Sequence, residues 1–418
     1  MSFKLVVLII IVLGAIAVAQ LIKLYEHSYK LRNRSEEEIP NRDNKLNATM
    51  LLVFGAVLFA FFIWLMAKYG YVSRGEAASK HGEGIDWLFD VNFVIIFAVF
   101  FLTNGALFWF SYKYVRKPGV KALFFTHSNK LELIWTVIPA IVLAFIIIVG
   151  LKSWNDITAP SDNQAINVEI FSEQFKWTAR YAGPDNTLGG FDYKLTTNNN
   201  PLAIVTTASL DTAIRLMEYG SNDGSILGMA LLEKKLNNPS NMFIPKDRAK
   251  MEKELDSKSR LVRLLHQMRA RHDSKRDANA YDDVLETDTL HLIVDQDYEF
   301  TFRAKDVIHS VYMPHFRLQM NTVPGMVTRF KMTPTITTSE IRKRRNNPTF
   351  NYIILCNKVC GSAHYKMKMI VVVETKAEFD QWMAKKKNFG TTFLTTNAAE
   401  PTLPVDATPT SDSLVALK

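Results

Sequence analysis

Cysteine is nearly absent from this chain, with two residues in 418. Two cysteines cannot form the disulfide framework of a small secreted domain. The sequence also lacks an arginine-rich tail and zinc-finger spacing, although its net charge is +9. The basic character therefore favours anionic lipid or an acidic protein as partner, and gives no support for nucleic acid.

Charged residues are missing from four long apolar runs near the N-terminus. A bilayer core requires about 20 apolar residues in a helix, and each run meets or approaches that length. The last run contains Pro139 near its start, where neighbouring helices can compensate for the lost hydrogen bond. We predict four membrane-spanning helices rather than buried helices of a soluble core, at Leu5–Ile22, Ala48–Ala67, Val91–Tyr112 and Leu133–Leu151.

Lysine and arginine concentrate in two of the connecting loops, Lys23–Asn47 and Lys113–Glu132. The positive-inside rule places these loops in the cytoplasm, so everything after Leu151 is expected outside. A cleavable signal peptide ending near Ala17–Gln20 is the alternative. Cleavage would leave three spans and put the basic loops on the wrong side, so an uncleaved first helix is favoured.

After Lys152 the apolar runs become short and alternate with polar residues, as in "LHLIV" and "YEFTFRA". Such runs, separated by Pro, Gly and Asn turns, predict a β-sandwich or barrel. A polar segment at 185–283 interrupts them and contains a helical pattern with an apolar face formed by Met251, Leu255, Val262 and Leu265. The segment is either a solvated helix or a basic docking arm. The Thr/Pro/Ala-rich tail at 394–418 is predicted to be disordered.

Both cysteines stand in "LCNKVCGSAHYKMKM", with a histidine and a methionine close behind. Thiolate and thioether are soft ligands that favour copper, and imidazole also suits it, whereas structural zinc sites contain no methionine. A second imidazole follows a predicted strand upstream. A disulfide and a mononuclear copper carrier stay open, and His315 and Met369 compete as donors with the expected set of Cys356, Cys360, His364, Met367 and His309.

Four stretches resemble subunit II of bacterial haem–copper cytochrome c oxidase. They are "NKLELIWTVIPAIVL", "EQFKWTARY", "DVIHSVYMPHFRLQMNTVPGM" and "CNKVCGSAHYKM". The resemblance implies a membrane-anchored all-β protein, in which a periplasmic cupredoxin-like Greek-key β-sandwich follows the helices. The implied parts are the usual helix pair at 91–152 and the cupredoxin domain at 153–393. The two extra helices at 1–90 and the insertion at 185–283 lie outside the usual plan of that family.

The resemblance also implies a binuclear copper centre, CuA. In that family Cys356 and Cys360 would bridge two copper ions, and His309 and His364 would each bind one. Met367 and the backbone carbonyl of Lys358 would complete the two sites. The centre would accept electrons from cytochrome c, soluble or tethered. It would pass them to haem in subunit I, where oxygen is reduced to water and protons are pumped.

The resemblance gives further expectations for four residues. Glu132 would lie at the entrance of a proton-uptake path, although a headgroup position is the plain alternative. Phe175 stands where the family often has the tryptophan that receives the electron, so Trp177 is the other candidate. Lys358 replaces a glutamate whose carboxylate reaches magnesium; an ammonium group cannot ligate a cation, which leaves a magnesium site in doubt.

The expected partners are subunit I, other oxidase subunits, cytochrome c and membrane lipid, in the inner membrane of a bacterium. The extra helices and the insertion suggest contact with another respiratory complex. Three other classes remain: a copper-free quinol-oxidase subunit, which would lack these donors; a copper-delivery or sensing protein, which would not need the helix motif around Glu132; and a nitric oxide or nitrous oxide reductase component. No helix carries a histidine suited to haem, so oxygen reduction is not expected in this chain.

Overall fold

The computed structural model describes residues 3–31, 41–70, 74–117, 119–124, 126–161, 164–221, 224–239, 241 and 243–398; the side chains at 3–11, 29–31 and 397–398 lie outside the description. The chain divides into two units. A helical unit comprises Met1–Gly75 and Asp90–Val142, and a sandwich unit comprises Glu76–Phe89 and Leu143–Lys418. The predicted boundaries at residues 90 and 152 stay predictions.

Four long helices contain the apolar runs. They are α1 (Phe3–Leu31), α2 (Asn41–Tyr69), α3 (Lys80–Lys113) and α4 (Asn129–Thr158). Among the described residues, α2, α3 and α4 are long and apolar enough to cross a membrane. These three contain the predicted spans at 48–67, 91–112 and 133–151. The remaining predicted span, at residues 5–22, lies in α1. The side chains at 5–11 lie outside the description, so this span stays a prediction.

Aromatic side chains pack α2 against α3 within the helical unit. The Phe59 ring lies 4.9 Å from Phe101 and 6.1 Å from Phe108, measured between centroids. Gly55 makes this approach possible, because a Cβ at that position would lie 2.4 Å from the Phe108 ring. Helix α4 continues through Pro139, and none of its residues is buried. Its apolar surface must therefore be covered by lipid or by another protein.

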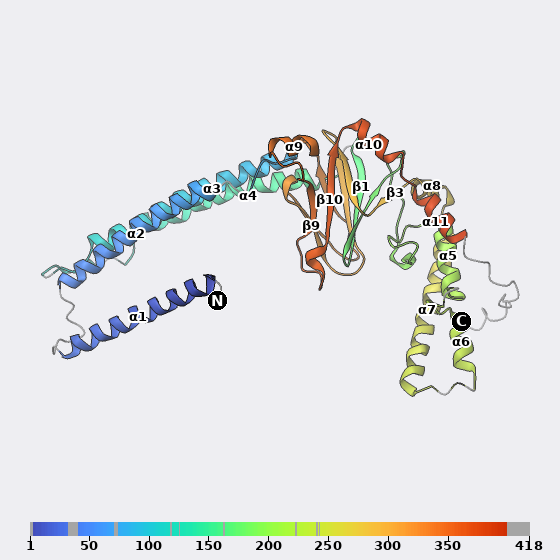
Figure 1. Cartoon of the computed structure of the whole chain (residues 1–418), viewed down its shortest axis with the longest axis horizontal. Coiled ribbons are helices and arrows are strands. Elements are labelled where there is room, and N and C mark those ends of the chain that lie inside the picture. The colour runs from blue at the N-terminus through green and yellow to red at the C-terminus, as the bar shows by residue number, and fades with distance from the viewer. Residues whose placement is uncertain are drawn as a thin grey trace. The chain divides into compact units, whose positions relative to one another are not determined.

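Two five-stranded sheets form the sandwich unit (Figure 1). The first has the order β3-β2-β1-β5-β8 and the second the order β4-β10-β9-β6-β7. Strands β1 and β5 pair in parallel, as do β4 and β10, while the remaining pairs are antiparallel. The first sheet's strands are β1 (Ile166–Glu173), β2 (Lys176–Tyr181), β3 (Val284–Glu286), β5 (Tyr298–Ala304) and β8 (Thr328–Met332).

The second sheet consists of β4 (Thr289–Ile293), β6 (His309–Met313), β7 (Leu318–Thr322), β9 (Tyr352–Cys356) and β10 (Lys368–Glu374). The alternating run "YEFTFRA" is β5, and its Tyr298, Phe300 and Phe302 are fully buried. These rings join residues of the second sheet, such as Val311 and Ile354, in one apolar core. The predicted two-sheet β-rich fold is therefore confirmed, because the period of two sends alternate side chains into a shared core.

Short helices connect or follow the strands from β6 to β10 in the sandwich unit. They are α9 (Thr338–Arg344), α10 (Lys376–Met383) and α11 (Phe389–Ala398), with one-turn helices at Pro314–Phe316 and His364–Lys366. The prediction of a disordered tail from residue 394 is wrong for residues 394–398, which are helical. Phe389 and Phe393 anchor α11 by packing with Phe171 and Ile204 in a buried cluster. Residues 399–418 lie outside the described residues.

The predicted insertion between β2 and β3 is largely helical (Figure 1). It contains α5 (Thr207–Glu218), α6 (Met229–Asn237), α7 (Pro245–Arg271) and α8 (Ala278–Tyr281), with one-turn helices at Tyr193–Leu195 and Ser274–Asp277. The predicted apolar face is that of α7, where Val262 and Leu265 are buried and the other two positions half-buried. Leu265 packs against Leu210, Ala213 and Ile214 of α5, so the helices have a small core of their own.

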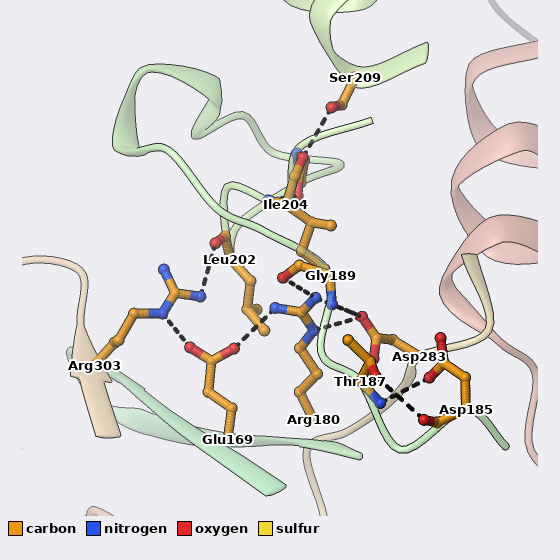
Figure 2. A network of polar contacts seen from close by, with 11 residues as sticks. Glu169, Arg180, Asp185, Thr187, Gly189, Leu202, Ile204, Ser209, Asp283 and Arg303 are labelled. Atoms are coloured by element: carbon orange, nitrogen blue, oxygen red, sulfur yellow. Dashed lines mark hydrogen bonds and ion pairs between the residues drawn. The ribbon is translucent and has the colours of Figure 1, made fainter. Parts of the chain in front are cut away.

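A buried ionic network joins the insertion to the first sheet (Figure 2). Arg180 of β2 contacts Glu169 of β1 at 3.0 Å and also Asp283, and it donates to the Gly189 carbonyl at 2.7 Å. Arg303 of β5 contacts the other Glu169 oxygen and the Leu202 carbonyl. Burial alone would raise the pKa of Glu169, but the two guanidinium groups lower it. The charges are thus paired, as buried ions must be.

We expect that Arg180→Met unpairs this network, because Asp283 and one Glu169 oxygen would stay buried without their cation. Loss of one partner of a buried ion pair costs about 3–5 kcal/mol. Hydrogen exchange of the β1 and β2 amides in the full-length chain measures the change in opening free energy. Arg260→Met on the exposed face of α7 is the control and should cost less than about 0.5 kcal/mol. Equal protection in both variants would contradict the expectation.

Candidate metal centre

Four connections between strands meet at one end of the sandwich. They are residues 174–175 between β1 and β2, 305–308 between β5 and β6, 323–327 between β7 and β8, and 357–367 between β9 and β10. Hydrogen bonds join three of these connections: the Gln174 N–H donates to Asp306 at 2.8 Å, and the Gln174 side chain donates to the Cys360 carbonyl. The strand ends therefore hold these loops in fixed positions.

One cysteine, Cys356, immediately precedes the 357–367 loop, and the other, Cys360, lies within it. Cys356 is the last residue of β9, and the sheet register pairs it with Val311, two residues after His309. The Cys356 sulfur lies 3.9 Å from His309 Nδ1 and 3.8 Å from the Cys360 sulfur. His309, Cys356 and Cys360 form the one group of three or more His, Cys, Asp or Glu ligand atoms found close together in the described part of the chain.

The rest of the predicted donor set surrounds the same two sulfurs. The Cys360 sulfur lies 3.5 Å from His364 Nδ1 and 3.8 Å from the Met367 sulfur. The Lys358 carbonyl oxygen lies 3.1 Å from the Cys356 sulfur, while the Lys358 side chain is exposed. All six predicted donors are therefore brought together, although their role as ligands stays a prediction.

The two competing donors lie elsewhere. His315 is in the turn after β6, where its ring packs 5.0 Å from Phe350 and 5.5 Å from Tyr352. Burial there lowers the pKa of His315 to about 4. Met369 is buried in the core opposite Ile354 on β9. Both methionines are buried, but Met367 immediately precedes β10 at the loop end, whereas Met369 lies two residues further along the strand. Two residues of a strand span about 6.6 Å, which moves Met369 away from the cysteines.

Both cysteines are free thiols. Their sulfur atoms are 3.8 Å apart, whereas a disulfide bond is about 2.05 Å long. Burial, together with the neighbouring Cys356, raises the pKa of Cys360 to about 11. A bound cation would reverse this preference, because metal binding deprotonates a coordinating thiol.

Asp306 contacts His309 on the ring nitrogen that faces away from the cysteines. The sequence alone did not single out this carboxylate. His309 Nε2 lies 2.9 Å from an Asp306 carboxylate oxygen, which leaves Nδ1 facing the cysteines. Burial raises the pKa of Asp306, but hydrogen bonds from His309 and from the Gln174 and Val307 N–H groups outweigh this and lower it. The spacing Asp-x-x-His was the available signal, because a carboxylate commonly orients a ligating histidine.

The two aromatic candidates lie at different depths. The Trp177 side chain is buried on β2, with its ring centroid 6.1 Å from that of His309. Phe175 is half-buried in the turn before β2, against Gly361 of the 357–367 loop. Trp177 therefore does not reach the surface, and Phe175 is the candidate nearer to solvent.

Glu132 lies in the other unit, in the first turn of α4. Its side chain accepts a hydrogen bond from the Ser128 N–H at 3.3 Å and lies 3.8 Å from His127. This contact caps the start of the helix, as carboxylates in a first turn commonly do. A role in proton uptake stays a prediction.

Fold and site together define a membrane-anchored β-sandwich protein with a cluster of soft metal-ligating groups at one end. Residues 68–153 match the family model of the cytochrome c oxidase subunit II transmembrane domain. The chain is 24% identical over 347 residues to the alternative cytochrome c oxidase subunit 2 of Bradyrhizobium diazoefficiens, covering 81% of this chain and 91% of that one. It is 25% identical over 346 residues to cytochrome c oxidase subunit 2 of Thermostichus vulcanus, covering 81% and 86%.

The predicted resemblance to subunit II of cytochrome c oxidase is therefore confirmed, and the relatives that carry it are named as subunits of that oxidoreductase complex. Among solved structures, the periplasmic domain of subunit II of cytochrome oxidase (CoxB) of Bradyrhizobium japonicum covers 54% of this chain and 94% of its own length. Its sequence identity is 12% and its TM-score 0.25, which is too low to carry an argument about shared structure.

We expect that Gly361→Ala disturbs the 357–367 loop. Gly361 has φ +142°, and an added Cβ would lie 2.8 Å from Gln174 Nε2 and 2.9 Å from the Phe175 ring. The Gln174 side chain would have to release the Cys360 carbonyl, at a cost of about 1–3 kcal/mol. Thermal unfolding of the metal-free full-length chain measures the loss. Gly190→Ala, where the added Cβ meets open space, is the control, and equal stability of the two variants would refute the expectation.

Proposed function

We propose that this chain is the subunit of a bacterial cytochrome c oxidase that receives electrons from cytochrome c. Its sandwich unit holds two copper ions as CuA, and the electrons continue to haem in subunit I, where oxygen is reduced to water and protons are pumped. The observation that carries the proposal is the convergence of two thiols, two imidazoles, a thioether and a carbonyl at one end of the sandwich.

The donor set fits copper by its chemistry. Thiolate and thioether are soft ligands, and imidazole suits copper as well. The 3.8 Å between the two sulfurs is close to the roughly 3.7 Å expected for two ligands at about 2.3 Å on one tetrahedral ion. Copper, when bound, would supply one-electron redox chemistry by alternating between its two common oxidation states.

The number of donors favours two ions over one. Two four-coordinate ions need eight ligand positions, and six donors fill them when each of Cys356 and Cys360 bridges both ions. His309, His364, Met367 and the Lys358 carbonyl would then each bind one ion. A mononuclear site of the blue-copper type uses one thiolate, so the second cysteine would have no function there.

The chain's own residues would keep such a centre rigid and dry. His309, Cys360 and Met367 are buried, and the strands β6, β9 and β10 fix the backbone on both sides of the loop. Asp306 holds His309 by its second nitrogen. A preorganised site of this kind moves little when its charge changes, which lowers the cost of electron transfer.

Other functions are less well supported. A copper-free subunit would not need this donor set, and a copper-delivery protein would not need a helix pair that matches the subunit II transmembrane family. The relatives reported above are named as oxidase subunits rather than nitric oxide or nitrous oxide reductases. We also propose Glu132 at the entrance of a proton-uptake path, and no magnesium ligand from the Lys358 side chain.

Copper loading tests the proposal. The full-length chain in detergent should bind two copper ions and give an EPR hyperfine pattern of one electron shared by both. Cys356→Ser should abolish that pattern and the oxidation of cytochrome c by the assembled oxidase. One copper per chain, or retained turnover in Cys356→Ser, would overturn the proposal.

Two matched pairs of variants serve as controls. His309→Gln and Met367→Leu should lose or shift the copper spectrum, because each removes a proposed ligand. His315→Gln and Met369→Leu should preserve it, because both side chains lie away from the cysteines. A spectrum sensitive to His315 or Met369, and insensitive to the other pair, would contradict the ligand assignment.

The insertion is proposed to contact another respiratory complex or a tethered cytochrome. Helices α5 to α7 can be removed with a short linker, because the two ends of the removed segment lie close together: the Thr207 N–H donates to the Asp277 carboxylate at 3.1 Å. Replacing Thr207–Arg276 with a short Gly/Ser linker keeps Asp283 and Gly189 of the ionic network. Copper content should be unchanged, while co-purification with the partner complex is lost. Unchanged assembly and turnover would reject this role.

A further inference from the structure

Large apolar side chains are exposed around the candidate metal centre. They stand in three of the four connections that form this end of the sandwich. Val359 and Tyr365 are the most prominent, at 82% and 77% exposed, and both belong to the 357–367 loop. We call the set the apolar rim: Val307, Ile308, Met326, Val327, Val359 and Tyr365.

The apolar rim is local to this end. Within the described residues 284–383, the one further exposed large apolar side chain is Ile370, close to the same end of β10. Contiguous exposed apolar side chains commonly mark an interaction surface, whereas single scattered ones do not. Because the rim surrounds the proposed electron-accepting site, its occupant has to bring a redox group close to the cysteines.

The charges around the apolar rim are mostly positive. Lys358, Lys366 and Lys368 are exposed, and none has a carboxylate partner among the residues described. The nearby carboxylates are already engaged: Glu173 pairs with Lys176 and Lys305 at 2.8 and 2.6 Å. Asp306 is held by His309. The resulting surface has an apolar centre and uncompensated ammonium groups at its edge.

We propose that this face docks an electron-carrier protein whose own contact surface is acidic around an apolar, exposed haem edge. The inference rests on the proposed function and deepens it by assigning the charge of the donor. Opposite charges steer the encounter and raise the association rate, while the apolar centres exclude water at the contact. In the transfer one ferrous haem becomes ferric and the acceptor gains one electron, and no bond breaks and no proton moves.

Two forms of one cytochrome provide the probe: a basic mitochondrial-type cytochrome c, and the same protein with its lysines succinylated, which makes it acidic. Binding of each oxidised form to the full-length chain in nanodiscs is measured at low ionic strength by surface plasmon resonance. We expect the acidic form to bind at least about tenfold more tightly, and its advantage to fall as salt screens the charges.

The double variant Lys366→Glu/Lys368→Glu should reverse this preference, and it leaves all proposed ligands in place. Lys385→Glu is the matched control; this exposed lysine follows α10, which begins beyond the opposite end of β10. It should behave as the unmodified chain does. The copper EPR signal and oxidation of the small reductant tetramethyl-p-phenylenediamine by the assembled oxidase report whether the centre itself is intact.

These readouts separate the two proposals. Loss of the copper signal in the unmodified protein would overturn the proposed function. An intact copper signal with tighter binding of the basic cytochrome, or with equal and salt-independent binding of both, would overturn the acidic-donor proposal alone. Binding of phosphatidylglycerol vesicles through Lys366 and Lys368, with neither cytochrome bound, would assign the face to lipid and also overturn it.

Discussion

The pairing of β9 between β6 and β10 is the constraint on which the candidate site depends. This register sets Cys356 opposite Val311 and so brings His309 within 3.9 Å of the cysteine sulfur. The return of the chain into β10 closes the 357–367 loop and adds Cys360, His364 and Met367 to the same place. A shift of one residue in this pairing would turn every side chain to the other face and scatter the donors.

The loop is supported from a second direction by the first sheet. Gln174, in the turn between β1 and β2, contacts both Asp306 and the Cys360 carbonyl. Asp306 in turn orients His309. The donors come from the second sheet and its loop, while Gln174 comes from the first sheet. The site therefore depends on the shared apolar core, because that core fixes one sheet against the other. The same arrangement leaves the apolar rim and its lysines facing outward, where a partner can reach them.

A buried ionic network solves a separate problem, the attachment of a long helical insertion. The insertion leaves the sandwich after β2 and returns at β3, and Arg180 contacts residues near both points. Glu169 and Arg303 extend the network across β1 and β5. Buried charges are costly unless they are paired, so the paired network fixes where the insertion emerges from the sandwich.

Much of this organisation could be predicted from the sequence. Charge-free runs of bilayer length predicted the helices α2, α3 and α4, and the period of two predicted strands such as β5. The clustering of Cys356, Cys360, His364 and Met367 within twelve residues limited the site to one loop before any contact was known. These features are local, because spacing along the chain translates directly into helix length, strand face or loop content.

Only the tertiary structure decided the choices that depend on distant segments. It showed that His309 and Met367, and not His315 and Met369, lie beside the cysteines. It also showed that Trp177 is buried and that Asp306 contacts His309 on the side away from the cysteines. It also showed that residues 394–398 are helical, because Phe389 and Phe393 of the same helix pack in a buried cluster with Phe171. Composition predicted disorder there because it contains no information on packing against distant segments of the chain. The sequence by itself determined which donors were available, and the sheet register decided which of them meet.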